Sequence, residues 1–294
     1  MALGAGAFLP RLAAAQSQQS KLLIIAAHPD DEYAFAAATY RLVRESGWIA
    51  DQVVITNGES GYRYSTLAEK FYGVSLAPTD QGRAHLVEIR KQEAQNAGKL
   101  LGIRRHYFLD QRDLGFETSA ASADSSNWDR PYLRAFLSGL ISREKYDVVF
   151  TLLPTAETHG HHRAATLLAL EAVSSLPGDR PLVFGAEPRE SSEAAPTFSG
   201  LPGQPLTRTL LRAPALVFDR DAAFGYHDQL NYQIVSSWLI AEHKSQGLFQ
   251  KDYGQHRFEQ FWLFEVSREP ALEHLSALEA LFYPATREVT AQRE

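Results

Sequence analysis

Short apolar runs of strand length recur along the chain, and each is followed by a stretch with the composition of a helix. The apolar runs are residues 21–27, 52–58, 106–110 and 147–154, and the expected helices are residues 31–46, 82–101, 131–143 and 162–175. Uninterrupted apolar runs of this length are typical of strands buried on both faces. The alternation predicts βαβ units and an α/β fold, with a mainly parallel sheet flanked by helices.

The C-terminal third predicts fewer regular elements. A strand is expected at residues 215–218, a helix at residues 230–243 and a late strand at residues 261–266. Residues 176–214 are rich in Pro, Gly and Ser, so we interpret them as a loop rather than a second core. The chain is therefore expected to form a single domain over residues 21–294, with a C-terminal extension.

Charge and cysteine content narrow the classes of function. The chain has 29 Lys and Arg against 35 Asp and Glu, a formal net charge of −6, so it lacks the basic field that nucleic acid would require. We therefore expect no nucleic-acid partner. The chain contains no Cys, which excludes thiolate nucleophiles and leaves His, Asp and Glu as metal ligands.

The first 20 residues differ from the rest of the chain. Residues 2–9 are small and apolar, and three alanines precede Gln16 as at a signal cleavage site, although a basic n-region is missing. A disordered leader and the remainder of a signal peptide both stay open, and we expect a periplasmic or secreted protein rather than a cytoplasmic one. No stretch reaches the roughly 18 apolar residues of a membrane span, so no integral membrane segment is expected.

Polar residues follow the first predicted strand, at the edge where ligands of open α/β sheets bind. Residues 27–32 read AHPDDE. A spacing of three lets His28 and Asp31 point to the same side of a strand-to-helix junction and share a cation, with Asp30 beside them. The same acidic residues would also serve as a helix cap that favours the helix dipole.

A histidine cluster follows the strand predicted at residues 147–154. Residues 158–162 read THGHH and hold three of the chain's 10 histidines. An accidental polar loop is the alternative, but histidine is uncommon and this cluster, like the first, follows a buried strand. Together His28, Asp31 and His162 would supply three ligands and leave one position open for water, as in catalytic zinc sites.

The segment AHPDDE resembles the signature of the PIG-L/LmbE-like zinc deacetylases, and HGHH at residues 159–162 resembles the family's second motif, His-Pro-Asp-His. Weaker matches follow in the family's order: TNGESG at 56–61, Arg90 with Glu93, RDLG at 112–115 and HKSQ at 243–246. The resemblance spans residues 21–246. It implies a Rossmann-like fold and metal-dependent hydrolysis of an N-acetyl group, on a glucosamine-type sugar or a related conjugate.

The resemblance also implies the roles of the two motifs. Zn²⁺, with Fe²⁺ or Co²⁺ as substitutes, would be held by His28, Asp31 and His162. Asp30 would accept the proton of the metal-activated water, and His159 would stabilise the oxyanion of the tetrahedral intermediate.

Further matches carry more than one interpretation. Arg90 and Asp113 match sugar contacts of the family, although a surface ion pair and a turn would explain them equally well. Glu32 is expected to support the helix start or the metal ligands. The second motif departs from the family at His161, where the family has a carboxylate that tunes the oxyanion histidine.

The departure at His161 leaves several hypotheses open. The chain is a zinc deacetylase with a slower or retuned site, or His161 replaces His162 as the metal ligand. A sugar-binding protein that kept the fold and the metal but lost turnover is the alternative to an enzyme. A phosphate or nucleotide binder is a further class, but neither glycine-rich phosphate motif follows a predicted strand.

Overall fold

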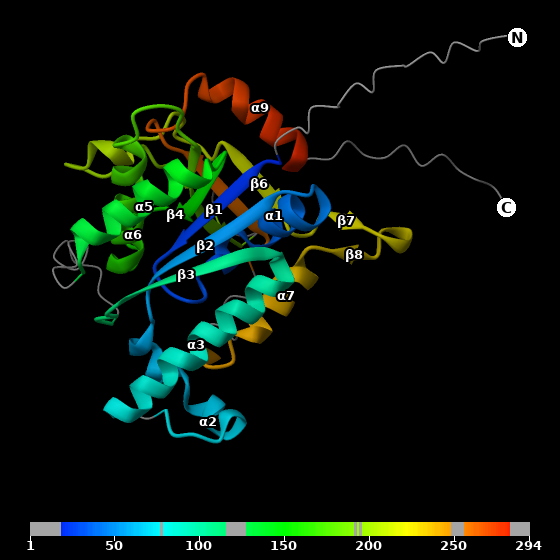
Figure 1. The fold of residues 1–294 in the computed structure, drawn as a ribbon. Coiled ribbons are helices and arrows are strands. Elements are labelled where there is room, and N and C mark those ends of the chain that lie inside the picture. The colour runs from blue at the N-terminus through cyan, green and yellow to red at the C-terminus, as the bar shows by residue number, and fades with distance from the viewer. Residues whose placement is uncertain are drawn as a thin grey trace, which may run out of the picture.

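The computed structural model describes residues 19–76, 79–115, 128–190, 193, 196–247 and 256–282. Its centre is a seven-stranded sheet in the order β3-β2-β1-β4-β5-β9-β6 (Figure 1). The strands are β1 (Lys21–Ala26), β2 (Ile49–Thr56), β3 (Ile103–Gln111), β4 (Val148–Leu152), β5 (Leu182–Arg189), β6 (Leu216–Asp219) and β9 (Phe258–Leu263). A small ribbon pairs β7 (Ala223–Phe224) with β8 (Leu230–Asn231).

The sheet is mainly parallel, as predicted. The pairs β3·β2, β2·β1, β1·β4 and β4·β5 are all parallel, whereas β9 runs antiparallel to both β5 and β6. Consecutive strands spread outward from β1 in one direction, and the chain then crosses to β4 on its other side. Such a switch point opens a crevice beyond the carboxyl ends of the strands.

Helices cover both faces of the sheet (Figure 1). One face packs against α1 (Ala36–Tyr40), α3 (Asp80–Leu101), α7 (Gln233–Glu242) and α9 (Ala271–Phe282), and the other against α5 (Arg130–Glu144) and α6 (Gly160–Ser174). Alternate residues of β1 divide between the two cores: Leu22 and Ile24 enter the first, Leu23 and Ile25 the second. The short helix α2 (Thr66–Tyr72) packs beside α3, outside these layers.

The prediction that residues 176–214 form only a loop is wrong, because β5 lies within them. Its apolar run is short, and the Pro, Gly and Ser around it favoured a loop. Val183 and Phe184 are nevertheless fully buried between β4 and β9. The sequence also did not predict α9, and the helix expected from residue 230 begins at Gln233 because β8 precedes it.

The helix expected at residues 31–46 is divided into a 3₁₀ turn (Asp31–Phe35), α1 and a π-helical turn (Arg41–Glu45). The division has a tertiary cause. The buried carboxylate of Glu259 on β9 accepts hydrogen bonds from the N–H groups of Ala37 and Ala38, at 2.8 Å each. A side-chain acceptor at this place starts a new helix.

The predicted leader, residues 1–20, lies outside the described residues apart from its last two positions. Within the described parts of the chain, no helix combines the length and the apolar character that crossing a bilayer requires.

Candidate active site

The two motifs meet at the carboxyl edge of the sheet. β1 and β4 are parallel neighbours, with Leu23 opposite Val149, and each motif follows one of these strands. Because parallel strands end at the same edge, side chains distant in sequence converge there. His28 and His162 are 134 positions apart, yet Nδ1 of the first lies 3.1 Å from Nε2 of the second.

Three donor atoms converge at this edge. Oδ1 of Asp31 lies 3.6 Å from Nδ1 of His28 and 3.1 Å from Nε2 of His162, and the two nitrogens are 3.1 Å apart. Tetrahedral ligands at about 2.0–2.1 Å from a zinc ion are separated by roughly 3.3 Å. The donor set and its spacing therefore fit a tetrahedral metal ion.

Main-chain and side-chain hydrogen bonds orient two of these donors. Oδ2 of Asp31 accepts the N–H groups of Ala27 at 2.7 Å and His28 at 2.9 Å, and Nδ1 of His162 lies 3.3 Å from the Thr158 hydroxyl. Burial alone would raise the pKa of Asp31, but the neighbouring His162 and His28 hold it well below its usual value. Asp31 is thus an oriented carboxylate, ready to serve as a ligand.

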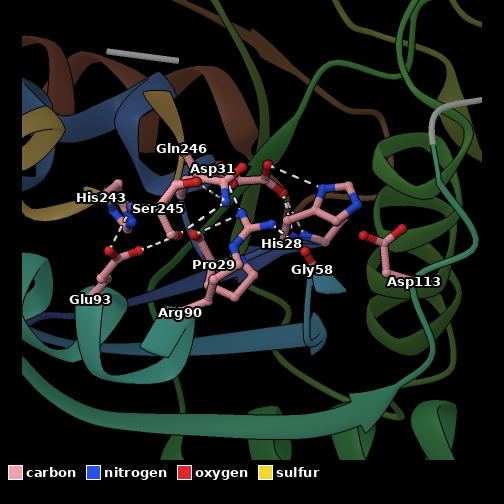
Figure 2. Close-up of polar contacts among 12 residues, drawn as sticks. His28, Pro29, Asp31, Gly58, Arg90, Glu93, Asp113, His243, Ser245 and Gln246 are labelled. Atoms are coloured by element: carbon pink, nitrogen blue, oxygen red, sulfur yellow. Dashed lines mark hydrogen bonds and ion pairs between the residues drawn. The ribbon is translucent and has the colours of Figure 1, made fainter. Parts of the chain in front are cut away.

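Asp30 lies beside this group and pairs with a buried arginine. Nη2 of Arg90 lies 2.8 Å from Oδ2 of Asp30, and the guanidinium also donates to the carbonyls of Gly58 and Pro29, at 2.6 and 3.1 Å (Figure 2). Burial raises the pKa of Asp30, although the charge of Arg90 opposes the shift. Gly58 has φ 66°, and a Cβ there would collide with the guanidinium.

Arg90 is buried beside the predicted metal ligands, and its contact with a sugar stays a prediction. Its side chain is only 3% exposed, and its hydrogen bonds go to the protein. The surface ion pair considered for it is excluded by this burial.

His159 caps the helix that carries His161 and His162. Its Nδ1 accepts the backbone N–H of His161 at 3.0 Å, so in the neutral ring the proton lies on Nε2. Burial, together with the neighbouring histidines, lowers the pKa of His159 to about 2. These surroundings favour the neutral form of the His159 ring over the imidazolium.

His161 is fully buried behind the cavity wall. Its Nδ1 lies 3.2 Å from Nε2 of His28 and 3.4 Å from Oδ1 of Asp113. Asp113 also accepts the N–H groups of Ser60 at 3.0 Å and Gly115 at 2.9 Å. Burial opposes the ionisation of Asp113, but the hydrogen bond with His161 and its other partners lower the pKa below its usual value.

Glu32 lies behind the site rather than in it. The side chain is fully buried, and its carboxylate accepts hydrogen bonds from Nε2 of His243 at 2.8 Å and from the Gln52 amide at 3.2 Å. These contacts tie the 3₁₀ turn after β1 to β2 and to the end of α7.

A cavity of about 530 Å³ opens over these residues. Seven of the predicted site residues line it, namely His28, Asp30, Asp31, Arg90, Asp113, His159 and His162, whereas His161 and Glu32 do not. His256 also lines the cavity, and its Nδ1 lies 3.1 Å from the Tyr33 hydroxyl. No sequence pattern distinguishes this residue from an ordinary histidine. Glu157 and Glu187 are two further lining residues without a sequence signal.

A family model described as "PIG-L: GlcNAc-PI de-N-acetylase" matches residues 23–173, just over half of the chain. The chain belongs to the PIG-L family. The matched segment runs from β1 to α6 and contains both motifs. The PIG-L/LmbE resemblance read from the sequence is thereby confirmed.

Similar proteins agree with this PIG-L assignment. The probable N-acetyl-alpha-D-glucosaminyl L-malate deacetylase 2 of Bacillus cereus is 24% identical over 174 residues, which cover 59% of this chain and 70% of the relative.

Two solved structures share the fold. GalB, the 4-carboxy-2-hydroxymuconate hydratase of Pseudomonas putida KT2440, superposes with a TM-score of 0.55 at 17% identity, over 83% of this chain and 96% of GalB. The zinc-inhibited form of teicoplanin deacetylase Orf2 gives a TM-score of 0.51 at 17% identity, over 83% and 98% of the two chains.

Proposed function

We propose that this PIG-L protein is a metal-dependent N-deacetylase that hydrolyses the N-acetyl group of a glucosamine-type sugar or a related conjugate. One observation carries the proposal: donor atoms of His28, Asp31 and His162 converge on one point beside the Asp30 carboxylate. The descriptions of the family and of the Bacillus cereus relative both name deacetylation of an N-acetylglucosamine unit.

Zinc is the ion that suits this donor set. Two imidazoles, one carboxylate and a vacant fourth position are the composition of a catalytic zinc site, and Fe²⁺ or Co²⁺ accept similar ligands. Zinc bound there would polarise the amide carbonyl and lower the pKa of a bound water.

Asp30 is the base in this proposal. Arg90 holds Oδ2 of the carboxylate, so the side chain keeps one orientation at the cavity wall. Burial raises the pKa of Asp30, which makes the ionised form a better proton acceptor than an exposed Asp. Arg90 serves as a positioning residue for this base.

His159 is the donor for the oxyanion. Its Nδ1 is engaged by the His161 N–H, so Nε2–H is the hydrogen-bond donor that the ring offers toward a substrate. A fixed neutral donor stabilises developing negative charge without needing to be protonated first. The leaving amine then takes its proton from Asp30, which received it from water.

The cavity suits a sugar. Its volume of about 530 Å³ lies within the usual range for small-molecule sites. Glu157, Glu187 and Arg63 also line it, and such side chains bind hydroxyl groups by charge-assisted hydrogen bonds.

Acetate release tests the proposal. Protein loaded with one equivalent of zinc is incubated with N-acetylglucosamine, its β-linked dimer and C1-linked conjugates, and acetate and free amine are measured together. We expect equimolar acetate and amine from at least one compound, and release slowed by at least about 10²-fold with Asp30→Asn. No acetate from the whole panel, with the metal bound, would contradict the proposal.

One observation favours a second candidate, a sugar-binding protein with little turnover. His161 occupies the position of the carboxylate in the family's second motif, and it leaves His159 without an adjacent negative side chain on α6. This candidate predicts saturable binding of the same sugars, with metal bound and no acetate released.

A further inference from the structure

The ring of His28 has a second nitrogen, which faces a second group of possible ligands. Nδ1 of His28 faces Asp31 and His162, whereas Nε2 lies 3.2 Å from Nδ1 of His161. Ring nitrogens of His28, His159 and His161 all lie within 4.8 Å of one another. The imidazole of His161 thus lies at the opposite edge of the ring from the first group, and His159 is close to both rings.

We propose that His28, His159 and His161 form a second binding site for a divalent transition-metal ion, which shares only His28 with the site of His28, Asp31 and His162. The separation of 3.2 Å between the nitrogens of His28 and His161 is close to the roughly 3.3 Å expected between two tetrahedral zinc ligands. His159 would bind through Nε2, because its Nδ1 accepts the His161 N–H.

A buried carboxylate adds negative charge next to this three-histidine site. Oδ1 of Asp113 lies 3.4 Å from Nδ1 of His161, and Asp113 is only 6% exposed. In Figure 2 it lies on the opposite side of His28 from Arg90. Because backbone N–H groups of Ser60 and Gly115 fix the carboxylate, it lowers the cost of placing a cation among neutral rings.

The chemistry of the two sites differs. The first offers two nitrogens and a carboxylate oxygen, whereas the second offers three imidazoles. Imidazole sets favour Zn²⁺, Cu²⁺ and Ni²⁺ and bind Mg²⁺ poorly. An ion on Nε2 of His28, with another ion on Nδ1, takes the place of the remaining ring proton, which passes to the solvent. Because removing this ring proton costs free energy, the second site binds its ion more weakly than the first.

The second site depends on His161, the residue at which the second motif differs from the family. A carboxylate in place of His161 would leave two imidazoles, His28 and His159, at this edge. The HGHH sequence supplies the third.

Occupation of the second site has a consequence that rests on the proposed function. His159 cannot both bind an ion through Nε2 and donate Nε2–H to an oxyanion. Excess zinc should therefore inhibit acetate release in proportion to occupancy of the second site.

Binding is measured on the protein already loaded with one zinc per chain. The protein is equilibrated with increasing free zinc, and bound zinc is determined by elemental analysis. We expect wild type to reach two ions per chain. His161→Gln should stop at one, His162→Gln should lose the first ion and keep the second, and His274→Gln on α9 should behave as wild type. A wild-type plateau at one ion, or a second ion retained by His161→Gln, overturns the proposal.

A second measurement uses wild type alone, so it does not depend on how the variants fold. Cu²⁺ is added to the zinc-loaded protein, and retained zinc is checked by elemental analysis. Electron paramagnetic resonance then counts the nitrogens on copper. We expect hyperfine coupling of the copper to three imidazole nitrogens, with the zinc retained. Copper bound by two or fewer nitrogens, or a total of one metal ion per chain after copper has replaced the zinc, overturns the proposal.

Acetate release in the same titration separates this inference from the proposed function. Inhibition by excess zinc in wild type, absent in His161→Gln, supports the second site. Two bound ions without acetate release at any loading would contradict the proposed function and leave the second site established. Full activity with two ions bound would contradict the assignment of His159 as its ligand.

Discussion

The two edges of the His28 ring are built in different ways. The Nδ1 edge faces Asp31 and His162, which follow the neighbouring strands β1 and β4, and Asp31 is fixed by N–H groups of its own turn. The Nε2 edge faces His161, whose partner Asp113 follows β3 and is held by Ser60 from the turn after β2.

The Nδ1 edge thus joins two motifs that directly follow neighbouring strands, whereas the Nε2 edge also depends on the segments that follow β2 and β3. A change of Asp31 or His162 at the Nδ1 edge removes a ligand of the first ion and should abolish both zinc binding and acetate release. Changes of His159, His161 or Asp30 leave the ligands Asp31 and His162 of the first ion in place, so their effects on acetate release should be graded. Variants at both edges test this contrast.

The largest effect is expected at the Nδ1 edge. His162→Ala should lose the first ion and, with it, acetate release to below detection, because a site with two protein ligands holds zinc poorly. His161→Ala is the matched variant and should keep that ion. The measurement is zinc content after dialysis against dilute chelator. The reverse pattern would make His161 the ligand and shift the register of the second motif.

A smaller but still large effect is expected for the base. Asp30→Asn should lower kcat by about 10²- to 10⁴-fold while zinc content stays near one ion per chain, because the proton acceptor is lost and no ligand is removed. Asp31→Asn, the adjacent change, should lose the ion. If Asp30→Asn loses zinc and Asp31→Asn retains it, the two roles are exchanged.

Variants of His159 test whether this residue stabilises the oxyanion through a neutral N–H donor. His159→Leu removes the N–H and should lower kcat by about 10²- to 10³-fold. His159→Gln keeps an N–H donor at a similar reach, and we expect it to recover activity to within about tenfold of wild type. Steady-state kinetics at saturating sugar provide the comparison. Equal losses in the two variants would show that the ring donates a proton rather than a hydrogen bond.

The smallest effect is a shift of the pH profile. Burial raises the pKa of Asp30 and the charge of Arg90 lowers it, so Arg90→Met should raise the pKa further. The base must be ionised to act, and the acidic limb of kcat/KM should therefore move to higher pH. Lys91→Met, which removes the neighbouring cation paired with Asp110, should leave the limb unchanged. An unmoved limb in Arg90→Met would mean that Asp30 is not the titrating base.

Much of the fold follows from local pattern, and the exceptions have tertiary causes. The runs before His28 and after Tyr146 are long and apolar enough to indicate parallel strands, which the structure contains. β5 could not be predicted in the same way, because the Pro and Gly around it favour a loop. It forms a strand because it pairs with β4 and β9 inside the sheet. The helix after β1 is divided by Glu259, a residue more than 200 positions away.

The site divides in the same way. The spacing of His28 and Asp31 predicts a shared ligand, because three residues at a strand end suffice to bring them together. The contact between His161 and Asp113 depends on how the start of α6 meets the segments that follow β2 and β3. His256 reaches the cavity only through its place before β9. No local pattern carries such information, so the sequence cannot distinguish these residues from ordinary polar positions.

Removal and return of the metal in one preparation tests the central claim most directly. Zinc is removed by a chelator, acetate release from the best substrate is measured, and one equivalent of zinc is then restored. The account predicts that zinc content and acetate release fall together and return together in wild type, and that neither returns in Asp31→Asn. Acetate release that persists in the metal-free protein would contradict the account.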